Sequence, residues 1–155
     1  MKKLLVLATA LVAASGIGVA MAPSVSATSP RSGTLHVVKE CRVYFGAAGE
    51  HCTITSSNIS QIKVGSNVVY ASAAGDPIAG QLNSDLIIDG PGNNTAYGHV
   101  VLDLTTGTGV VTLSGGTGSF KHFHARVDVA PVTPPVSLTP PYFAWDGPYS
   151  FDPPN

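Results

Sequence analysis

The stretch Gly115-Gly116-Thr117-Gly118-Ser119-Phe120 joins two β-patterned segments, residues 109–114 and 121–129. A phosphate-binding loop would instead lead into a helix, and its signatures, G-x-G-x-x-G or a closing Gly-Lys-Ser/Thr, are missing here. The stretch is therefore predicted to be a strand-to-strand turn with left-handed glycines, and nucleotide binding is excluded. The residues assigned to this barrel-rim turn are Gly115, Gly116, Gly118 and Phe120. The ring of Phe120 is expected to plug the end of the barrel.

Segments rich in Val, Ile and Thr recur along the chain, separated by turn residues such as Asp89-Gly90-Pro91-Gly92. The predicted strands are residues 33–45, 52–57, 60–72, 78–89, 96–105, 109–114, 121–130 and 142–151. No convincing helix follows the N-terminal segment. The pattern predicts an all-β fold, a single antiparallel β-barrel of about eight strands with up-and-down or Greek-key connections, because closure removes exposed sheet edges.

Alternation within these strands separates an apolar face from a polar face. Histidines and carboxylates, among them His99, Asp85 and Asp128, fall mostly on the outer face. The lumen candidates are Leu82, Ser84, Leu86, Val100, Leu102, Phe123, Val127, Phe143 and Trp145. The same parity places Ile78 and Leu104 inside, and it adds Lys39 as a polar exception if segment 33–45 contains no bulge.

Residues 1–27 have the features of a cleavable secretory signal peptide. They begin with the basic Lys2 and Lys3, continue with an apolar run and end with small residues at the expected cleavage site. The apolar run is too short for a permanent membrane anchor. We therefore expect a secreted single domain, residues 28–155, in which the proline-rich residues 131–141 connect to the last strand.

Only two cysteines, Cys41 and Cys52, are present, and in an exported chain such a pair predicts a disulfide. Without Lys2 and Lys3 the chain has 8 − 2 = 6 basic residues against 9 acidic ones. No basic stripe exists, so nucleic acid is not an expected partner. No cofactor is expected either.

Two motifs resemble those of a known group of barrels. The Gly115–Phe120 run resembles the G-G-T-G-x-[FY] turn of the allene oxide cyclase-like and dirigent-like proteins, which belong to the calycin-type group. The ending Trp145-Asp146-Gly147-Pro148-Tyr149-Ser150-Phe151 is similar to the W-D-G-T-Y-S-F ending of small exported bacterial proteins in that group, with Pro148 in place of threonine. The resemblance implies a barrel that is a lumen cyclase, a dirigent protein that orients radicals, or an exported protein without assigned activity. No family catalytic residue matches a position here.

Other chemistry is weakly encoded. His122 and His124 are the sharpest metal suggestion, and His99 could supply a third nitrogen if its strand lay nearby. A solvated outer face explains these histidines better, and no metal is predicted. The inferred inner face contains no carboxylate pair for acid–base work. The expected function is thus a non-catalytic exported barrel that binds a small apolar ligand in its lumen or acts as an extracellular interaction module. The alternative is a cyclase or isomerase acting on an apolar substrate in the lumen.

Overall fold

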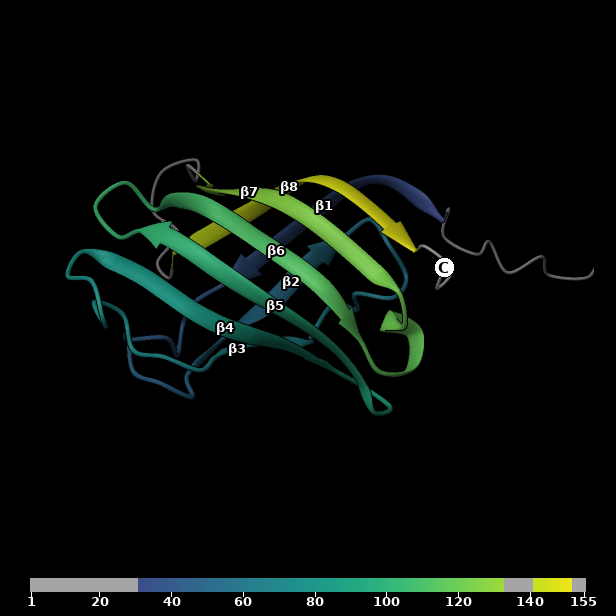
Figure 1. The fold of residues 1–155 in the computed structure, drawn as a ribbon, viewed down its shortest axis with the longest axis horizontal. Helices are drawn as coiled ribbons and strands as arrows, with labels where there is room; N and C mark the ends of the chain where they lie inside the picture. The colour runs from purple at the N-terminus through teal and green to yellow at the C-terminus, as the bar shows by residue number, and fades with distance from the viewer. Residues whose placement is uncertain (1–30, 133–140, 152–155) are drawn as a thin grey trace, which may run out of the picture.

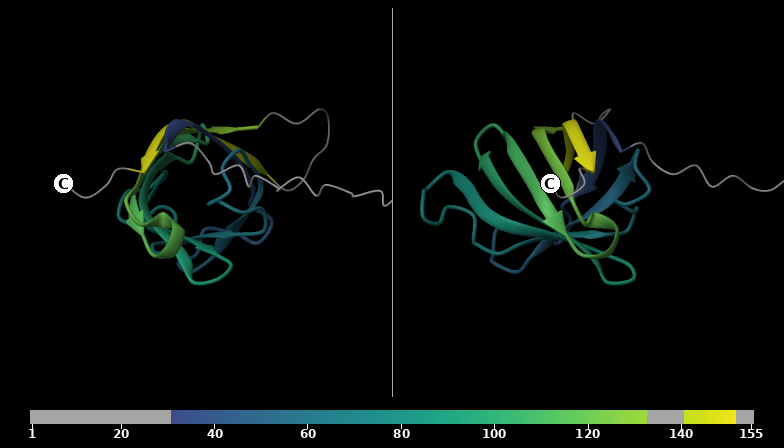
Figure 2. Two further views of the ribbon diagram at one scale, coloured as in Figure 1. Left: turned by 90° about the vertical axis from the view of Figure 1, so that its right-hand side faces the viewer. Right: turned by 45° about the vertical axis from the view of Figure 1, so that its right-hand side comes forward.

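The structure, a computed structural model, describes residues 31–132 and 141–151. They form a closed barrel in which each strand pairs antiparallel with the next and β8 pairs with β1 (Figures 1 and 2). The strands are β1 (Ser32–Glu40), β2 (His51–Ser57), β3 (Asn67–Tyr70), β4 (Gln81–Gly90), β5 (Asn94–Asp103), β6 (Thr108–Gly116), β7 (Phe123–Pro131) and β8 (Tyr142–Phe151). The predicted fold class is confirmed, and its connectivity is up-and-down.

Two predicted features fall mainly outside the described residues. These are the signal peptide, residues 1–27, and most of the 131–141 connection. Within the part of the chain that the structure describes, no helix has the length and apolar character of a membrane span.

Two predicted strands were too long. Segment 33–45 ends as a strand at Glu40, because the disulfide and the left-handed glycines Gly46 and Gly49 turn the chain. Segment 60–72 is a strand only over Asn67–Tyr70. One of its apolar residues, Ile62, is buried in the core although it belongs to an irregular segment outside the strands. The hydrophobicity of this segment therefore indicated burial but not a strand.

The inward placement of Ile78 and Leu104 was wrong. Their exposed fractions are 47% and 40%, because β4 begins only at Gln81 and β5 ends at Asp103. Alternation has no meaning beyond the end of a strand, where the chain leaves the pleat.

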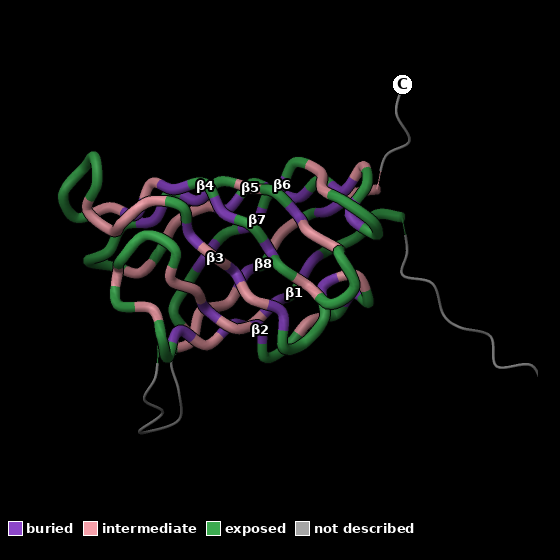
Figure 3. The backbone as a smooth tube through the Cα atoms, turned by 90° about the horizontal axis from the view of Figure 1, so that it is seen from below, coloured by how far each residue is buried: buried purple, intermediate pink, exposed green. Residues whose placement is uncertain are grey.

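Within the strands the predicted alternation is confirmed, and buried and exposed positions alternate along the wall (Figure 3). Eight of the nine lumen candidates are buried, and Phe143 is partly buried against the core. Lys39 also faces inward, since β1 pairs with β8 without interruption from Ser32 to Glu40. The irregularity between β1 and β2 leaves the inward direction of Lys39 unchanged.

The rim turn has the predicted form. Gly115 and Gly118 have φ angles of 97° and 55°, and a short 3-10 helix, η1 (Gly118–Phe120), follows. Gly116 is required by close approach, because a Cβ there would lie 2.0 Å from the Thr95 carbonyl oxygen. Phe120 is 1% exposed and its ring centroid lies 5.5 Å from that of Phe123. The ring therefore closes this end of the barrel, as expected.

The threonine of the motif ties the turn to the neighbouring strand. The Thr95 amide donates to the Thr117 hydroxyl oxygen at 3.0 Å, and the Thr117 hydroxyl donates to the Asn93 carbonyl at 2.9 Å. The Ser119 amide donates to the side-chain oxygen of Asn94 at 2.8 Å. These contacts explain the residues between the glycines, and they fix the 3-10 turn against the start of β5.

Candidate functional site

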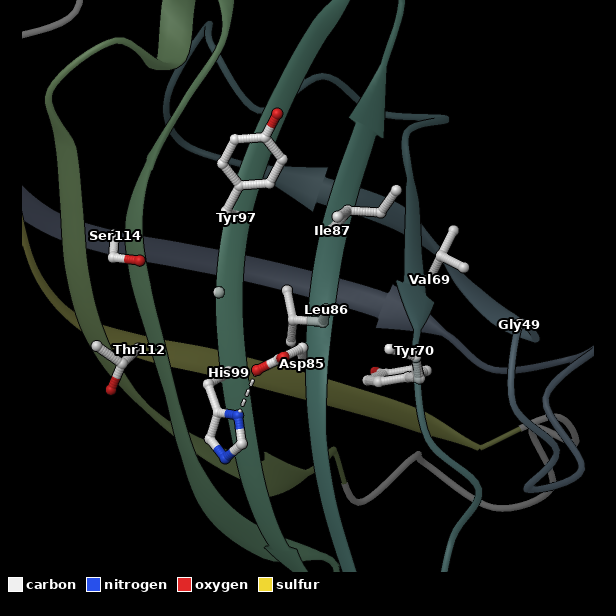
Figure 4. A pocket seen from close by; sticks show the side chains of 12 residues that line it. Gly49, Val69, Tyr70, Asp85, Leu86, Ile87, Tyr97, His99, Thr112 and Ser114 are labelled. Carbon is white, nitrogen blue, oxygen red and sulfur yellow. Dashed lines mark hydrogen bonds and ion pairs between the residues drawn. The ribbon is translucent and has the colours of Figure 1, made fainter.

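An apolar row crosses the outer surface of three neighbouring strands. Val69 on β3 pairs with Ile87 on β4, and Ile87 pairs with Tyr97 on β5. Their side chains lie side by side in Figure 4. Ile87 and Tyr97 are 37% and 47% exposed, which is unusual for such large apolar groups arranged next to one another. The row therefore presents a continuous apolar surface to solvent.

A polar row runs beside it. Asp85 on β4 pairs with His99 on β5, and His99 pairs with Thr112 on β6. The Asp85 carboxylate and His99 Nδ1 are 2.8 Å apart, with side-chain exposures of 83% and 47% (Figure 4). The outer wall thus offers a carboxylate and an imidazole at the border of an apolar strip.

Together the two rows line a hollow of about 560 Å³. This volume is within the range typical of small-molecule sites. Its lining is Gly49, Val69, Tyr70, Ala71, Asp85, Leu86, Ile87, Tyr97, Gly98, His99, Thr112 and Ser114. We call this hollow the outer groove. Gly98 in this lining is required by close approach, because a Cβ there would lie 2.6 Å from the buried Leu113 side chain and 2.7 Å from the Thr112 carbonyl oxygen.

A second unusual group lies inside the wall. Lys39 is 4% exposed, and its Nζ lies 2.5 Å from the Tyr70 hydroxyl oxygen. The same nitrogen is 3.8 and 3.7 Å from the sulfur atoms of Cys41 and Cys52, which form the predicted disulfide. No ion pair joins Lys39 to a carboxylate among the described residues. The amine is therefore buried without a counter-charge.

Aromatic rings surround this amine. Its nitrogen lies 5.2 Å from the ring centroids of Tyr70 and Phe143 and 5.5 Å from that of Trp145. The negative ring faces stabilise an ammonium only partly, and burial disfavours the charged form. Burial accordingly lowers the pKa of Lys39 from 10.5 to about 7. Burial, and next the nearby Tyr44, raise the pKa of the Tyr70 hydroxyl above 10.0.

The pattern of the sequence located some of these residues but did not assemble either site. Parity identified Lys39, Leu86, Phe143 and Trp145 as inward residues. The outer groove was missed, because it depends on the register of four strands. The sequence does contain one sign of the groove, because three strands each have an apolar residue at an outward position. These residues are Val69, Ile87 and Tyr97.

The histidines proposed as metal candidates are not brought together. His99 contacts Asp85, whereas His124 lies on β7, two strands away, and His122 precedes that strand. No group of three or more His, Cys, Asp or Glu side chains within residues 31–132 and 141–151 could hold a metal ion.

Comparison with known proteins does not assign the chain. No family model, no curated protein and no solved structure matches it.

Proposed function

We propose that this chain is an exported, non-catalytic barrel that binds a small, mainly apolar molecule, and that the outer groove is the binding site. The observation that carries the proposal is the apolar row of Val69, Ile87 and Tyr97 beside the Asp85–His99 pair, within a hollow of ligand size. An apolar body would lie on the row, and a polar or cationic group would contact the carboxylate.

The groove fits this role better than the lumen does. The inward side chains are buried against one another, whereas the groove is open to solvent and needs no rearrangement to admit a molecule. A rigid closed wall also holds the groove residues in a fixed register, which lowers the ordering cost of binding.

The rim turn and the C-terminal motif support placing the chain with the allene oxide cyclase-like and dirigent-like barrels. The closed eight-stranded antiparallel barrel is consistent with a calycin-like fold. The disulfide is compatible with an exported protein.

Two matched variants test the groove. Titration with N-phenyl-1-naphthylamine, an uncharged apolar fluorophore, is expected to give saturable binding to the unmodified protein. Ile87→Glu should weaken binding by about tenfold or more, because it places a charge in the apolar row. Val101→Glu should not, since Val101 is an outward residue of β5 with a similar exposure, 43%, that does not line the groove.

Equal affinities in all three proteins would place the probe elsewhere and contradict the groove. Absence of binding to the unmodified protein would argue against a small apolar ligand and favour an interaction module.

A second candidate function, a lumen cyclase or isomerase, is favoured by one observation. Lys39 and Tyr70 form a proton donor–acceptor pair inside an otherwise largely apolar wall. Turnover of an apolar polyene or epoxide that is lost in Lys39→Met but retained in Ile87→Glu would support it.

A further inference from the structure

Lys39 differs from the other described lysines in its surroundings. Lys63 and Lys121 are exposed, whereas Lys39 is 4% exposed and occupies the inward position that follows Leu35 and Val37 on β1. A leucine or methionine would fill such a position without a desolvation cost. The amine therefore needs an explanation beyond packing.

The polar groups around the amine have unused hydrogen-bonding capacity. An ammonium has three donors, and a neutral amine has two donors and a lone pair. Among the described residues, the Tyr70 hydroxyl oxygen is the one oxygen atom within hydrogen-bond distance of the amine. The Trp145 Nε1–H and the Tyr44 hydroxyl are also buried with no hydrogen-bond partner among those residues. Unpaired buried polar atoms are unusual in a native core, and each calls for an explanation.

The surroundings also decide which form of the amine prevails. No described carboxylate pairs with Lys39, and the contacts are two sulfur atoms and three aromatic rings. The neutral amine is thus accessible near neutral pH, in agreement with the lowered pKa of about 7. A neutral amine in a water-poor site is a nucleophile, and water exclusion protects an imine from hydrolysis.

We propose that Lys39 is a covalent capture site for small apolar aldehydes, which it binds as an imine. The Nζ lone pair attacks the carbonyl carbon, and the carbonyl π electrons move to oxygen. That oxygen takes a proton from the Tyr70 hydroxyl, and the resulting tyrosinate takes one from the positively charged nitrogen, which gives a neutral carbinolamine and restores the phenol. Loss of the hydroxyl group with a proton then releases water and leaves a C=N bond, so amine and aldehyde become imine and water.

Tyr70 is placed to transfer the protons. Its oxygen contacts Nζ at 2.5 Å, and its raised pKa keeps the hydroxyl protonated until a reacting oxygen accepts the proton. We assign Tyr70 as the proton donor of this capture reaction.

The position of Lys39 limits the size of the aldehyde. It lies near the end of β1, and the partly buried rings of Tyr44 and Phe143 pack over this end of the core. A ligand would reach the amine only if these two side chains moved, which favours a short aliphatic aldehyde over a bulky or charged one.

The inference does not rest on the outer groove. Lys39 does not line the groove, although its partner Tyr70 does, and fluorophore binding and aldehyde trapping are separate readouts. Failure of one proposal is therefore distinguishable from failure of the other.

Reductive trapping of the folded, disulfide-intact protein tests the proposal. Propanal and sodium cyanoborohydride at pH 7.5 convert an imine into a stable secondary amine, which peptide mapping assigns to a residue and separates from the α-amino group. Lys39 should be modified faster than Lys63 and Lys121, on the order of tenfold or more, because burial lowers the pKa of Lys39 to about 7 and leaves much of its amine neutral at this pH. Modification of Lys63 and Lys121 with Lys39 left intact would overturn the proposal.

Two variants separate the roles. Tyr70→Phe should slow the trapping of Lys39 several-fold and leave Lys63 and Lys121 unaffected, since it removes the acid but keeps the ring. An unchanged rate would remove Tyr70 from the reaction. Propionate, which has the same size but cannot form an imine, should not protect Lys39 from trapping. Full protection by propionate would show that the site is a carboxylate anchor and would overturn aldehyde capture.

Discussion

Lys39 and Tyr70 meet inside the barrel from strands that are not neighbours. Lys39 lies on β1 and Tyr70 on β3, and the contact of 2.5 Å between their polar atoms spans the intervening β2. The pair brings together an amine and a phenol that are 31 positions apart, and neither forms an ion pair with another residue in the described part of the chain. Several consequences of this burial can be measured without a ligand.

Replacing Lys39 by methionine should stabilise the protein at pH 7. The pKa of Lys39 falls from 10.5 when unfolded to about 7 when folded, so between these values the unfolded chain binds more protons. The free energy of unfolding therefore rises with pH between about 7 and 10.5. Below pH 7 the full cost of burying the charged amine remains, on the order of 5 kcal/mol. Urea unfolding at pH 7 and pH 10 should show a strong increase for the unmodified protein and little for Lys39→Met.

Lys63→Met is the matched control, because Lys63 is exposed and should leave the pH dependence intact. Measurements should stay at or below pH 10. Above pH 10 the raised pKa of Tyr70 lowers the stability of the fold, because the phenol then ionises in the unfolded chain but not in the folded one. An identical pH profile for Lys39→Met and the unmodified protein would contradict the burial argument.

Removing the disulfide should cost about 3 kcal/mol of unfolding free energy. The Cys41–Cys52 bond closes a loop with a sequence separation of 11, and loop-closure entropy gives this magnitude for a short loop. Both sulfurs are buried, so the Cys41→Ala/Cys52→Ala double variant avoids adding polar atoms to the core. The midpoint of urea unfolding with a reducing agent should differ from the midpoint without one for the unmodified protein. The two midpoints should coincide for the variant.

Phe120→Ala should destabilise the barrel by about 3–5 kcal/mol, the usual loss for a large buried aromatic residue. The ring is 1% exposed and packs on Phe123, which in turn contacts Phe151 at a centroid distance of 4.8 Å. Ser119→Ala, next to it and exposed, serves as the control. Thermal unfolding would contradict the plug role if both variants melted at the same temperature.

Asp85→Asn should affect ligand selectivity but not stability. The Asp85–His99 pair is largely exposed, and such pairs contribute less than about 1 kcal/mol. Asp85 supplies the one carboxylate of the groove lining. A cationic apolar fluorophore should therefore bind more weakly to the variant, while N-phenyl-1-naphthylamine binds equally. Loss of both probes would mean that Asp85 shapes the groove instead of supplying its charge.

Much of the wall could be predicted because its physics is local. Side chains alternate strictly along a strand, so the inward positions of Leu82, Ser84, Phe123 and Val127 follow from their spacing. The rim turn was equally local, since its glycines and Phe120 act within a few residues of one another. An isolated pair of cysteines likewise left one intramolecular pairing to predict.

The two candidate sites depend on contacts between distant strands. The outer groove needs the register that puts Val69, Ile87 and Tyr97 in one row, and spacing within a strand does not determine register between strands. The rings around Lys39 come from β3 and β8, so its inward direction was predictable but its partners were not. The overlong strands had a related cause, because a buried irregular segment and a strand share the same apolar residues.

The seam between β1 and β8 determines when this wall can be completed. Glu40 and Tyr142 pair across it although they are 102 positions apart, and at the other end the Phe151 amide donates to the Arg31 carbonyl at 2.6 Å. Until β8 is present, the open edges of β1 and β7 are both available to pair with other chains. A chain that is synthesised from its N-terminus must therefore complete its last strand before the barrel closes. Conversely, because Arg31 and Phe151 adjoin, a circular permutant that links them and opens a loop such as Pro91-Gly92 would have the same wall with its seam moved.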